Sequence, residues 1–420
     1  MKNLRGSLLF AQSGGPTAVI NAGAAGAVSA AMKNPQVTRV LGAIHGIKGV
    51  LTEHLFDLSK EDPKEIELLK TTPSAAFGSV RYRLKNWQDD ESDYLTIYRV
   101  FQKYDVRFFL YSGGNDSMDT CHKIADYLKH KGYDCAVIGV PKTIDNDLTA
   151  TDHCPGFGSA AKYLVTSVSE LILDAKTYDV GSILVMEMMG RNAGWLTAAS
   201  ALARKNGFGP DLIYLPERPF DLEQCKREVL EIYRKRGYCF LAVSEGIRDA
   251  KGHLIGSATA QAYANAHTDA FSHVRLGGVS SYLAAILSAE TGAKTRAIEF
   301  NLLQRCAAHS ASLTDVKEAF RAGEKAVLAA TKGETDKMVT FTRLPATKTK
   351  AYRLRYDLCP LAAVANVEKK VPDEYIAPAG NDVTEAFLTY AAPLIAGESR
   401  PPYDGGVPVY ARLKKVPAEA

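Results

Sequence analysis

The sequence lacks the cysteine patterns that mark disulfide-rich or zinc-binding proteins. Its 420 residues include seven cysteines, an odd number, and none of them forms a Cys-x-x-Cys pair. His153 and Cys154 are adjacent, but no further ligand follows at a spacing that suits zinc. Scattered cysteines in a chain of this length indicate reduced thiols and therefore a cytoplasmic protein.

Long hydrophobic runs and a basic stripe are also missing. No segment has 18 consecutive apolar residues, so no membrane span is expected, and the apolar run in the N-terminal MKNLRGSLLFAQSGG is too short for a signal peptide. The net charge is +4, but lysine and arginine alternate with acidic residues, which argues against a nucleic-acid partner. This balance is better suited to a small anionic substrate.

What the sequence does contain is an alternation of short apolar runs and amphipathic stretches. Strands are predicted at residues 6–12, 106–112, 135–141, 182–190, 211–217 and 239–246. Helical periodicity at 117–132 and 222–237 ends in glycine, as helices commonly do. This repetition predicts an α/β fold with doubly wound parallel sheets, in which ligands gather at the carboxyl ends of the strands. From about residue 336 the pattern becomes irregular, which suggests an extension that wraps the core.

Two glycine pairs follow predicted strands. Ser13, Gly14 and Gly15 come after the first strand, and Pro16 is suited to the first position of a helix. Backbone N–H groups at a helix start bind anions readily, although a tight turn without a ligand would give the same pattern. The second loop repeats this architecture with Gly113, Gly114, Asn115, Asp116 and Ser117.

The stretch PKTIDNDL, residues 141–148, has the composition of a catalytic segment. Asp145 and Asp147 alternate across Asn146, with Lys142 nearby. Such a cluster suits phosphoryl transfer, in which one carboxylate takes a hydroxyl proton, another helps to hold Mg²⁺ and a cation stabilises the leaving phosphate. An Asx-rich turn would explain the triplet alone, but not its position after a strand beside two glycine loops.

These stretches, together with MMGRNAGW (188–195), SEG (244–246) and TRAIEFNLLQR (295–305), resemble the 6-phosphofructokinase family. The resemblance runs from about residue 7 to residue 330. It implies two Rossmann-like doubly wound domains: a phosphoryl-donor half (1–140) and a sugar-phosphate acceptor half (141–335), with the chain crossing back between them, followed by the C-terminal extension (336–420). It also implies an enzyme of glycolysis or gluconeogenesis that phosphorylates the 1-hydroxyl of fructose 6-phosphate and uses Mg²⁺.

The resemblance assigns roles to individual residues. Asp145 would be the general base, Thr143 would lie against the transferring phosphoryl group, and Asp147 would help to arrange the metal. The acceptor would be bound by Met189, Gly190, Arg191, Glu245, Arg296 and Arg305, of which the last two would grip the 6-phosphate. In the family some of these arginines reach across a subunit boundary, which implies a homodimer or a homotetramer.

The resemblance further implies that the donor is pyrophosphate. ATP-using members carry glycine where this chain has Asp116, whose side chain would occupy the volume of the nucleotide's α-phosphate and repel its charge. They also carry glycine in place of Lys142, whose ammonium can offset charge on the departing phosphate, and some have an aromatic residue near adenine in place of Ile47. The donor site would comprise Gly14, Gly15, Arg81, Gly113, Gly114, Asn115, Asp116 and Ser117, with Mg²⁺ held by Asp116 and Asp147.

Three positions depart from the family pattern. Asn115 stands where the family usually has a metal-bound aspartate, and Leu302 replaces a histidine near the sugar phosphate. Ser182 falls roughly where bacterial ATP-dependent members carry a phosphate-contacting arginine. Either this branch replaces these contacts, or the alignment slips there.

Several alternatives stay open at this point. An ATP-dependent member is the nearest, because Lys142 also occurs in some ATP users. Sedoheptulose 7-phosphate is a second acceptor to consider, alongside or instead of the hexose. A catalytically silent sugar-phosphate sensor is disfavoured by the intact segment 143–147. A dinucleotide fingerprint in GFGSAA (156–161) is rejected because it does not follow a strand.

Overall fold

The computed structural model of the protein describes residues 4–256, 278–347 and 351–420. They form two compact units, each with its own sheet. Unit 1 comprises Met1–Ser159, Arg305–Glu368 and Gly397–Ala420, and unit 2 comprises Ala160–Gln304 and Lys369–Ala396. These bounds differ from the expected donor and acceptor halves, which describe binding roles and stay a prediction.

Unit 1 is built on a seven-stranded sheet with the order β12-β11-β5-β4-β1-β2-β3. Its strands are β1 (Gly6–Gln12), β2 (Val37–Ala43), β3 (Leu55–Asp57), β4 (Val106–Gly113), β5 (Ala136–Pro141), β11 (Lys337–Arg343) and β12 (Leu354–Pro360). The five central strands are parallel, and β3 and β12 are antiparallel edges. The doubly wound arrangement is therefore as predicted.

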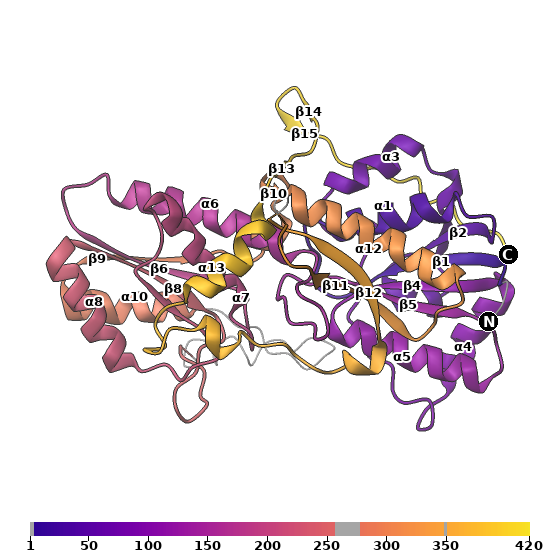
Figure 1. Ribbon diagram of the computed structural model, residues 1–420, viewed down its shortest axis with the longest axis horizontal. Coiled ribbons are helices and arrows are strands. Elements are labelled where there is room, and N and C mark those ends of the chain that lie inside the picture. The colour runs from indigo at the N-terminus through magenta and orange to yellow at the C-terminus, as the bar shows by residue number, and fades with distance from the viewer. Residues whose placement is uncertain (1–3, 257–277, 348–350) are drawn as a thin grey trace. The chain divides into compact units, whose positions relative to one another are not determined.

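Helices cover both faces of this sheet. In Figure 1, α1 (Ile20–Ala31) and α12 (Leu313–Thr331) lie on one face, and α4 (Ser92–Lys103) and α5 (Asn115–His130) lie on the other. The glycines of α1 let its backbone touch that of α12, because a Cβ on Gly26 would lie 1.9 Å from the carbonyl oxygen of Phe320. The Ala/Gly-rich stretch is thus a closely packed helix, as its composition suggests. Two short helices, α2 (Gly46–Leu51) and α3 (Pro63–Leu68), complete the N-terminal part.

The order of strands in unit 1 places both glycine loops at one point. After β1 the chain moves to β2 on one side, and it later returns to place β4 on the other side of β1. The crevice at such a switch point, outside the carboxyl ends of the strands, is where open α/β sheets bind ligands. The loop after β1 and the loop after β4 both lie there.

Unit 2 has a four-stranded parallel sheet in the order β7-β8-β6-β9. Its strands are β6 (Ser182–Met188), β7 (Leu212–Tyr214), β8 (Tyr238–Ser244) and β9 (Lys294–Glu299). Helices α8 (Leu222–Arg236) and α10 (Val279–Thr291) share one buried apolar cluster with the sheet, while α6 (Phe157–Ala175) lies on the other face. A second aromatic cluster joins α7 (Trp195–Ala199) to α13 (Glu385–Ala391), with Trp195 packed against Phe387 and Tyr390.

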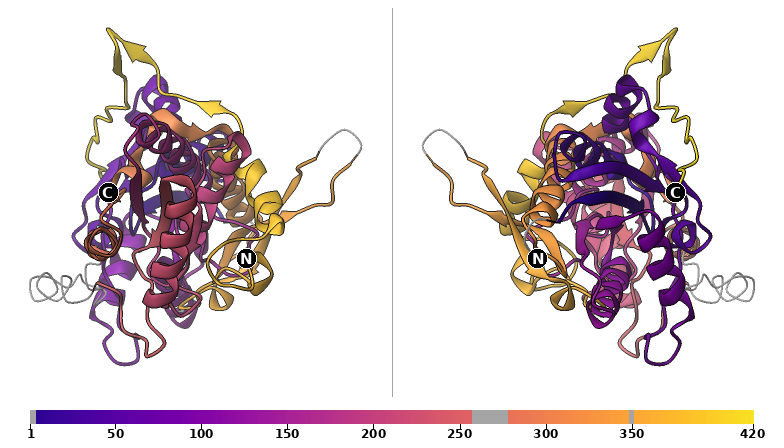
Figure 2. Two further views of the ribbon diagram at one scale, coloured as in Figure 1. Left: turned by 90° about the vertical axis from the view of Figure 1, so that its left-hand side faces the viewer. Right: turned by 90° about the vertical axis from the view of Figure 1, so that its right-hand side faces the viewer.

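The region after residue 336 is more regular than its sequence pattern indicates. β11 and β12 pair over seven residues each and extend the sheet of unit 1. Further on, β13 (Glu398–Ser399) pairs with β10 (Ala311–Ser312), which follows the short helix α11 (Leu303–Cys306) in the sequence. β14 (Tyr403–Asp404) and β15 (Val407–Pro408) form a small hairpin that projects from unit 1 (Figure 2). The last residues run along β3, where Ala418 N donates to Leu55 O at 3.0 Å.

Two further features concern the described part of the chain as a whole. None of the helices in the described ranges is both long enough and apolar enough to cross a membrane. All seven cysteines are free thiols, and five of them are buried.

Candidate active site

The first glycine loop turns sharply away from β1. Gly14 has a positive φ of 75°, a conformation that favours glycine. Its N–H donates to Val80 O at 3.3 Å, and Ser79 Oγ donates to Gly14 O at 2.6 Å. Pro16 is not the first residue of a helix, as the sequence suggested, because α1 begins four residues later, at Ile20. Residues 13–18 therefore form a loop that precedes the helix, whose first carbonyl acceptor is that of Val19.

Two buried amide side chains hold the segment that carries Arg81 against this loop. Gln12 Nε2 donates to Asn21 Oδ1 at 2.9 Å, and Gln12 Oε1 accepts from Phe77 N at 3.0 Å. Asn21 Oδ1 also accepts from Ala76 N at 2.8 Å. The sequence analysis did not single out either residue. A signal was available, because an amide side chain within an apolar strand or an alanine-rich helix is usually buried with its hydrogen bonds satisfied. These hydrogen bonds fix residues 76 and 77, and Arg81 follows shortly after them with its side chain exposed.

The second glycine loop leads directly into α5. A Cβ on Gly113 would lie 2.0 Å from Ser117 Oγ, so this turn requires glycine. Helix α5 begins at Asn115, whose Oδ1 accepts from Asp116 N at 2.7 Å. Asp116 is half-buried in the first turn, where the helix dipole favours a negative charge. Lys142 N donates to Gly113 O at 3.1 Å and joins this loop to the next segment.

The segment predicted to be catalytic, residues 142–147 (called the catalytic segment below), follows β5. Lys142 is buried, and its Nζ donates to Gly15 O at 2.7 Å, so the ammonium lies at the first glycine loop. Thr143 Oγ1 accepts from Asp145 N at 3.1 Å and donates to Asp145 Oδ2 at 3.3 Å. Asn146 has a positive φ of 54° and is fully buried. Hydrogen bonds between its own polar groups thus fix part of the loop's shape.

The charges of this segment perturb one another. Burial lowers the pKa of Lys142 to about 8; Asp145 and Asp147 oppose this shift, while Arg305 and Arg81 add to it. Burial raises the pKa of Asp145, and the Lys142 ammonium opposes that rise. A carboxylate with a raised pKa beside a cation suits a general base that works near neutral pH.

Arg305 belongs to the same cluster in unit 1. Its Nη1 lies 3.2 Å from the position that a Cβ on Gly15 would take. Burial lowers the pKa of Arg305, and the nearby Arg81 lowers it further. Three cationic side chains, Arg81, Lys142 and Arg305, thus act on one another beside the glycine loop. Such a concentration of positive charge suits a ligand with several negative charges.

In unit 2 the expected acceptor residues meet at the carboxyl ends of β6 and β8. Gly190 N donates to Glu245 Oε1 at 3.2 Å, and Glu245 N donates to Met188 O at 3.0 Å. Met189 N donates to Oε1 of the buried Gln304 at 3.2 Å, a contact that the sequence did not suggest. The structure therefore brings Met189, Gly190 and Glu245 together.

Comparisons with known proteins agree with this geometry. A family model described as Phosphofructokinase matches residues 7–330. The chain belongs to the phosphofructokinase family. It is 45% identical over 418 residues to a pyrophosphate–fructose 6-phosphate 1-phosphotransferase of Xanthomonas campestris, covering 98% of this chain and 97% of that relative. It is 43% identical over 411 residues to the protein of the same name from Methylococcus capsulatus, covering 97% and 96%.

A solved structure shares the whole architecture. The pyrophosphate-dependent phosphofructokinase of Nitrosospira multiformis superposes with a TM-score of 0.87 at 37% identity, covering 99% of this chain and 98% of that one. The resemblance to the phosphofructokinase family and the two-domain α/β fold are thereby confirmed. The roles of single residues stay predictions.

Two expected acceptor arginines occupy different places in this family member. Arg296 lies in the edge strand β9, where it pairs with Leu184 of β6, four residues before Met188. At about 3.3 Å per residue, this register places it roughly 13 Å along the strand from the carboxyl end. Arg305, in contrast, lies in unit 1 with the two glycine loops. The structure therefore does not gather Arg296 with Met189, Gly190 and Glu245.

Three other positions are clarified. Ser182 is the first residue of β6 and is buried, so it lies at the opposite end of that strand from Met189. The suspected slip in the alignment explains it better than a lost phosphate contact. Leu302 is 53% exposed. Ile47 is fully buried in the core beneath α5, so its side chain belongs to the packing of unit 1.

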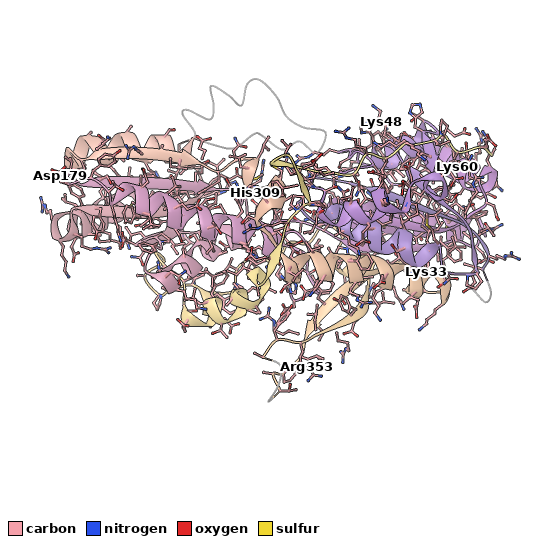
Figure 3. The ribbon with its side chains drawn as sticks, turned by 90° about the horizontal axis from the view of Figure 1, so that it is seen from above. Lys33, Lys48, Lys60, Asp179, His309 and Arg353 are labelled. Carbon is pink, nitrogen blue, oxygen red and sulfur yellow. The ribbon has the colours of Figure 1, made fainter. Side chains whose placement is uncertain are left out.

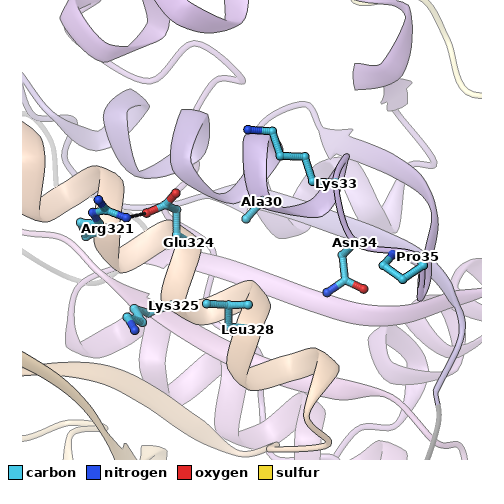
Figure 4. A pocket seen from close by; sticks show the side chains of 8 residues that line it. All are labelled: Ala30, Lys33, Asn34, Pro35, Arg321, Glu324, Lys325 and Leu328. Carbon is cyan, nitrogen blue, oxygen red and sulfur yellow. Dashed lines mark hydrogen bonds and ion pairs between the residues drawn. The ribbon is translucent and has the colours of Figure 1, made fainter.

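A surface hollow of about 330 Å³ on unit 1 lies away from these residues. The hollow lies at the C-terminal end of α1, whereas the first glycine loop precedes the N-terminal end of that helix. Because a helix of 12 residues is about 18 Å long, the hollow and the loop are separated by about that distance. Lys33 lies at the molecular surface there (Figure 3), and Arg321 is paired with Glu324, one turn further along α12, at 2.7 Å (Figure 4). It is lined by Ala30, Lys33, Asn34, Pro35, Arg321, Glu324, Lys325 and Leu328.

Proposed function

We propose that this family member transfers a phosphoryl group reversibly from pyrophosphate to the 1-hydroxyl of fructose 6-phosphate, giving fructose 1,6-bisphosphate and phosphate. The observation that carries the proposal is the buried Lys142 ammonium, which lies at the first glycine loop in the same segment as Asp145. A short donor with charge at both ends is suited to a site whose cations are concentrated in this way. The names of the relatives support the same donor.

In this mechanism Asp145 accepts the proton of the 1-hydroxyl, whose oxygen attacks the nearer phosphorus of pyrophosphate. The bond to the bridging oxygen breaks, and phosphate leaves with both electrons of that bond. Lys142, Arg81 and the backbone N–H groups of the glycine loops stabilise the charge on the leaving group. Thr143, which donates to Asp145 at 3.3 Å, would face the transferred group. Because pyrophosphate and the product ester have similar phosphoryl-transfer potentials, the reverse reaction should also be measurable.

We infer that Mg²⁺ accompanies the donor. Among the described residues no group of three or more histidine, cysteine, aspartate or glutamate side chains is arranged to hold a metal. Mg²⁺ commonly binds through one or two carboxylates and takes its other ligands from substrate phosphates and water, so a sparse site fits it. Asp116 and Asp147 would hold it, and when bound it would offset charge on the phosphates. Asn115 can contribute only a neutral oxygen.

Acceptor binding and assembly form the rest of the proposal. Met189, Gly190, Arg191 and Glu245 would bind the sugar, and Arg305 its 6-phosphate. Arg296 would act across a subunit boundary in a homodimer or homotetramer, since its position in β9 separates it from the others in one chain. The free thiols are in keeping with a cytoplasmic enzyme.

The experiment is an assay of the purified protein with each donor in turn. Fructose 6-phosphate and Mg²⁺ are supplied with pyrophosphate or ATP, and fructose 1,6-bisphosphate is measured. Turnover with pyrophosphate and at least 100-fold less with ATP is the expected result. Turnover with ATP alone would overturn the donor assignment, and no turnover with either would support a sensor. Sedoheptulose 7-phosphate as acceptor tests the breadth of the sugar site.

The lowered pKa of Lys142 leads to a prediction about pH. The lysine is charged below a pKa of about 8 and loses its charge above it, so kcat/KM for pyrophosphate should fall as the pH rises through that value. Lys142→Arg keeps its charge at these pH values and should lose this decline, even if its activity at pH 7 is lower. Because pyrophosphate itself also titrates, the two enzymes are compared over the same pH series. If kcat/KM falls in the same way at high pH in the wild type and in Lys142→Arg, Lys142 does not cause the decline.

A further inference from the structure

The catalytic segment contains no regular secondary structure, so other residues must fix its shape. The supporting segment, residues 151–156, runs beside it. Cys154 N donates to Asn146 Oδ1 at 2.9 Å, and Thr143 N donates to Pro155 O at 3.1 Å. Thr143 and Gly156 also form an isolated parallel bridge. Movement of the supporting segment would therefore move Thr143 and the carboxylates that follow it.

The supporting segment is in turn fastened to the first two turns of α12. Asp315 is buried, and its two carboxylate oxygens accept from Gly156 N at 2.9 Å and Ser159 N at 2.8 Å. One turn further along the helix, Glu318 Oε2 lies 2.7 Å from His153 Nε2. Burial raises the pKa of Asp315 to about 6, and the backbone N–H groups oppose this rise. Two acidic side chains of α12 thus hold the middle and the C-terminal end of the segment that supports the catalytic residues.

His153 lies between two carboxylates. Its Nδ1 is 2.8 Å from Asp152 Oδ2, opposite the contact with Glu318, and the residue is 1% exposed. Both neighbours are acceptors, so both ring nitrogens donate when the ring is an imidazolium. Burial opposes this charge, but Glu318 and Asp152 outweigh it and raise the pKa of His153. Arg343 of β11 binds Asp152 at 2.9 Å, and Tyr352 donates to Glu318 at 2.8 Å, so each carboxylate has a second partner.

We propose that His153, Glu318 and Asp315 are positioning residues for phosphoryl transfer. A buried imidazolium and a buried carboxylate hold the supporting segment on α12, and this segment holds Thr143, Asp145 and Asp147 in their reactive arrangement. The inference rests on the proposed function, because it assumes that the catalytic segment carries out the transfer. None of the three residues touches substrate in this account, since they act through the backbone of the catalytic segment.

The test uses substitutions that keep size and remove charge, in the full-length enzyme. His153→Gln, Glu318→Gln and Asp315→Asn are each expected to lower kcat about 10- to 100-fold while KM for pyrophosphate and fructose 6-phosphate changes less than about threefold, because misplacement affects the reacting atoms more than ground-state binding. His153→Gln combined with Glu318→Gln should cost little more than either alone, since the two act as one unit. Glu324→Gln, on the surface of the same helix, is the matched control.

Two further measurements separate positioning from a merely structural role. Thermal midpoints and far-UV circular dichroism identify the folded variants, and kcat is expressed per folded molecule. A lower midpoint with kcat within twofold of the wild type in the folded variants would overturn the proposal. Nitrogen-15 NMR of histidine-labelled enzyme should show two protonated ring nitrogens for His153 at pH 7.5, and this signal should be absent from His153→Gln. A neutral ring would overturn the proposal that an imidazolium holds the supporting segment. If the wild type uses another donor, the ratios are measured with that donor, so failure of the proposed function is seen separately.

Discussion

Asp145→Asn is expected to lower kcat about 100- to 10 000-fold with fructose 6-phosphate and pyrophosphate. General bases typically contribute this factor, because without one the hydroxyl must attack while it keeps its proton. The amide has the size of the carboxylate and can still accept from Thr143 Oγ1, so the hydrogen bond that shapes the segment is retained. What is removed is the basic oxygen and the negative charge beside Lys142.

Steady-state kinetics in both directions test this expectation. KM for either substrate should change far less than kcat, since the carboxylate acts mainly in the transition state. The thermal midpoint should stay near that of the wild type, because replacing a buried carboxylate of raised pKa by a neutral amide removes a charge that burial disfavours. A kcat within tenfold of the wild type would show that another group takes the proton.

Asp116→Gly is expected to raise kcat/KM for ATP about 100-fold or more. Asp116 occupies the first turn of α5 directly after the second glycine loop, where a longer polyphosphate would have to pass. Two unit charges about 5 Å apart repel by about 3 kcal/mol at an effective dielectric constant of about 20, which corresponds to about 100-fold in affinity. The volume of the side chain adds a steric cost that glycine removes.

Asp116→Asn distinguishes these two contributions, because it keeps the volume and removes the charge. If repulsion dominates, Asp116→Asn should recover most of the gain in ATP use, and if volume dominates, only Asp116→Gly should. Activity with pyrophosphate should fall in both variants, since Asp116 is also a proposed Mg²⁺ ligand. Adding Lys142→Gly should favour ATP further by removing the cation placed for the shorter donor. No gain with ATP in any of these variants would contradict the assignment of Asp116 to donor choice.

Much of the candidate site was predictable because its residues are close together in the sequence. The segment 141–148 follows a six-residue buried strand whose apolar run is unambiguous, and the same holds for the glycine pairs after β1 and β4. Once parallel strands are inferred, their carboxyl ends must share one edge of a sheet, so these loops were expected to meet. Their spacing and order were enough to indicate phosphoryl transfer.

Other contacts join residues that are far apart in the chain and have no local signature. The start of α1 was misplaced at Pro16, because proline is permitted at the first helical position but does not enforce it. The strand β2 begins with half-exposed and polar residues, which hide it in the sequence. The residues of β11 and β12 also resemble irregular structure in the sequence, and only their pairing with each other shows them to be strands. Gln12 and Asn21 look like isolated polar residues until the fold places residues 76 and 77 against them.

The sequence by itself determined the fold class, the family and the order of the catalytic motifs, because each depends on hydrophobic periodicity or on residues within a few positions of one another. Only the tertiary structure decided that Arg305 lies beside the first glycine loop, that Arg296 lies apart from the other residues expected to bind the acceptor, and that His153 is held between two carboxylates, one of them 165 residues away on α12. Burial and charge pairing arise when distant segments meet, so the pKa values of Lys142, Asp145 and His153 are properties of the folded chain and not of any local pattern.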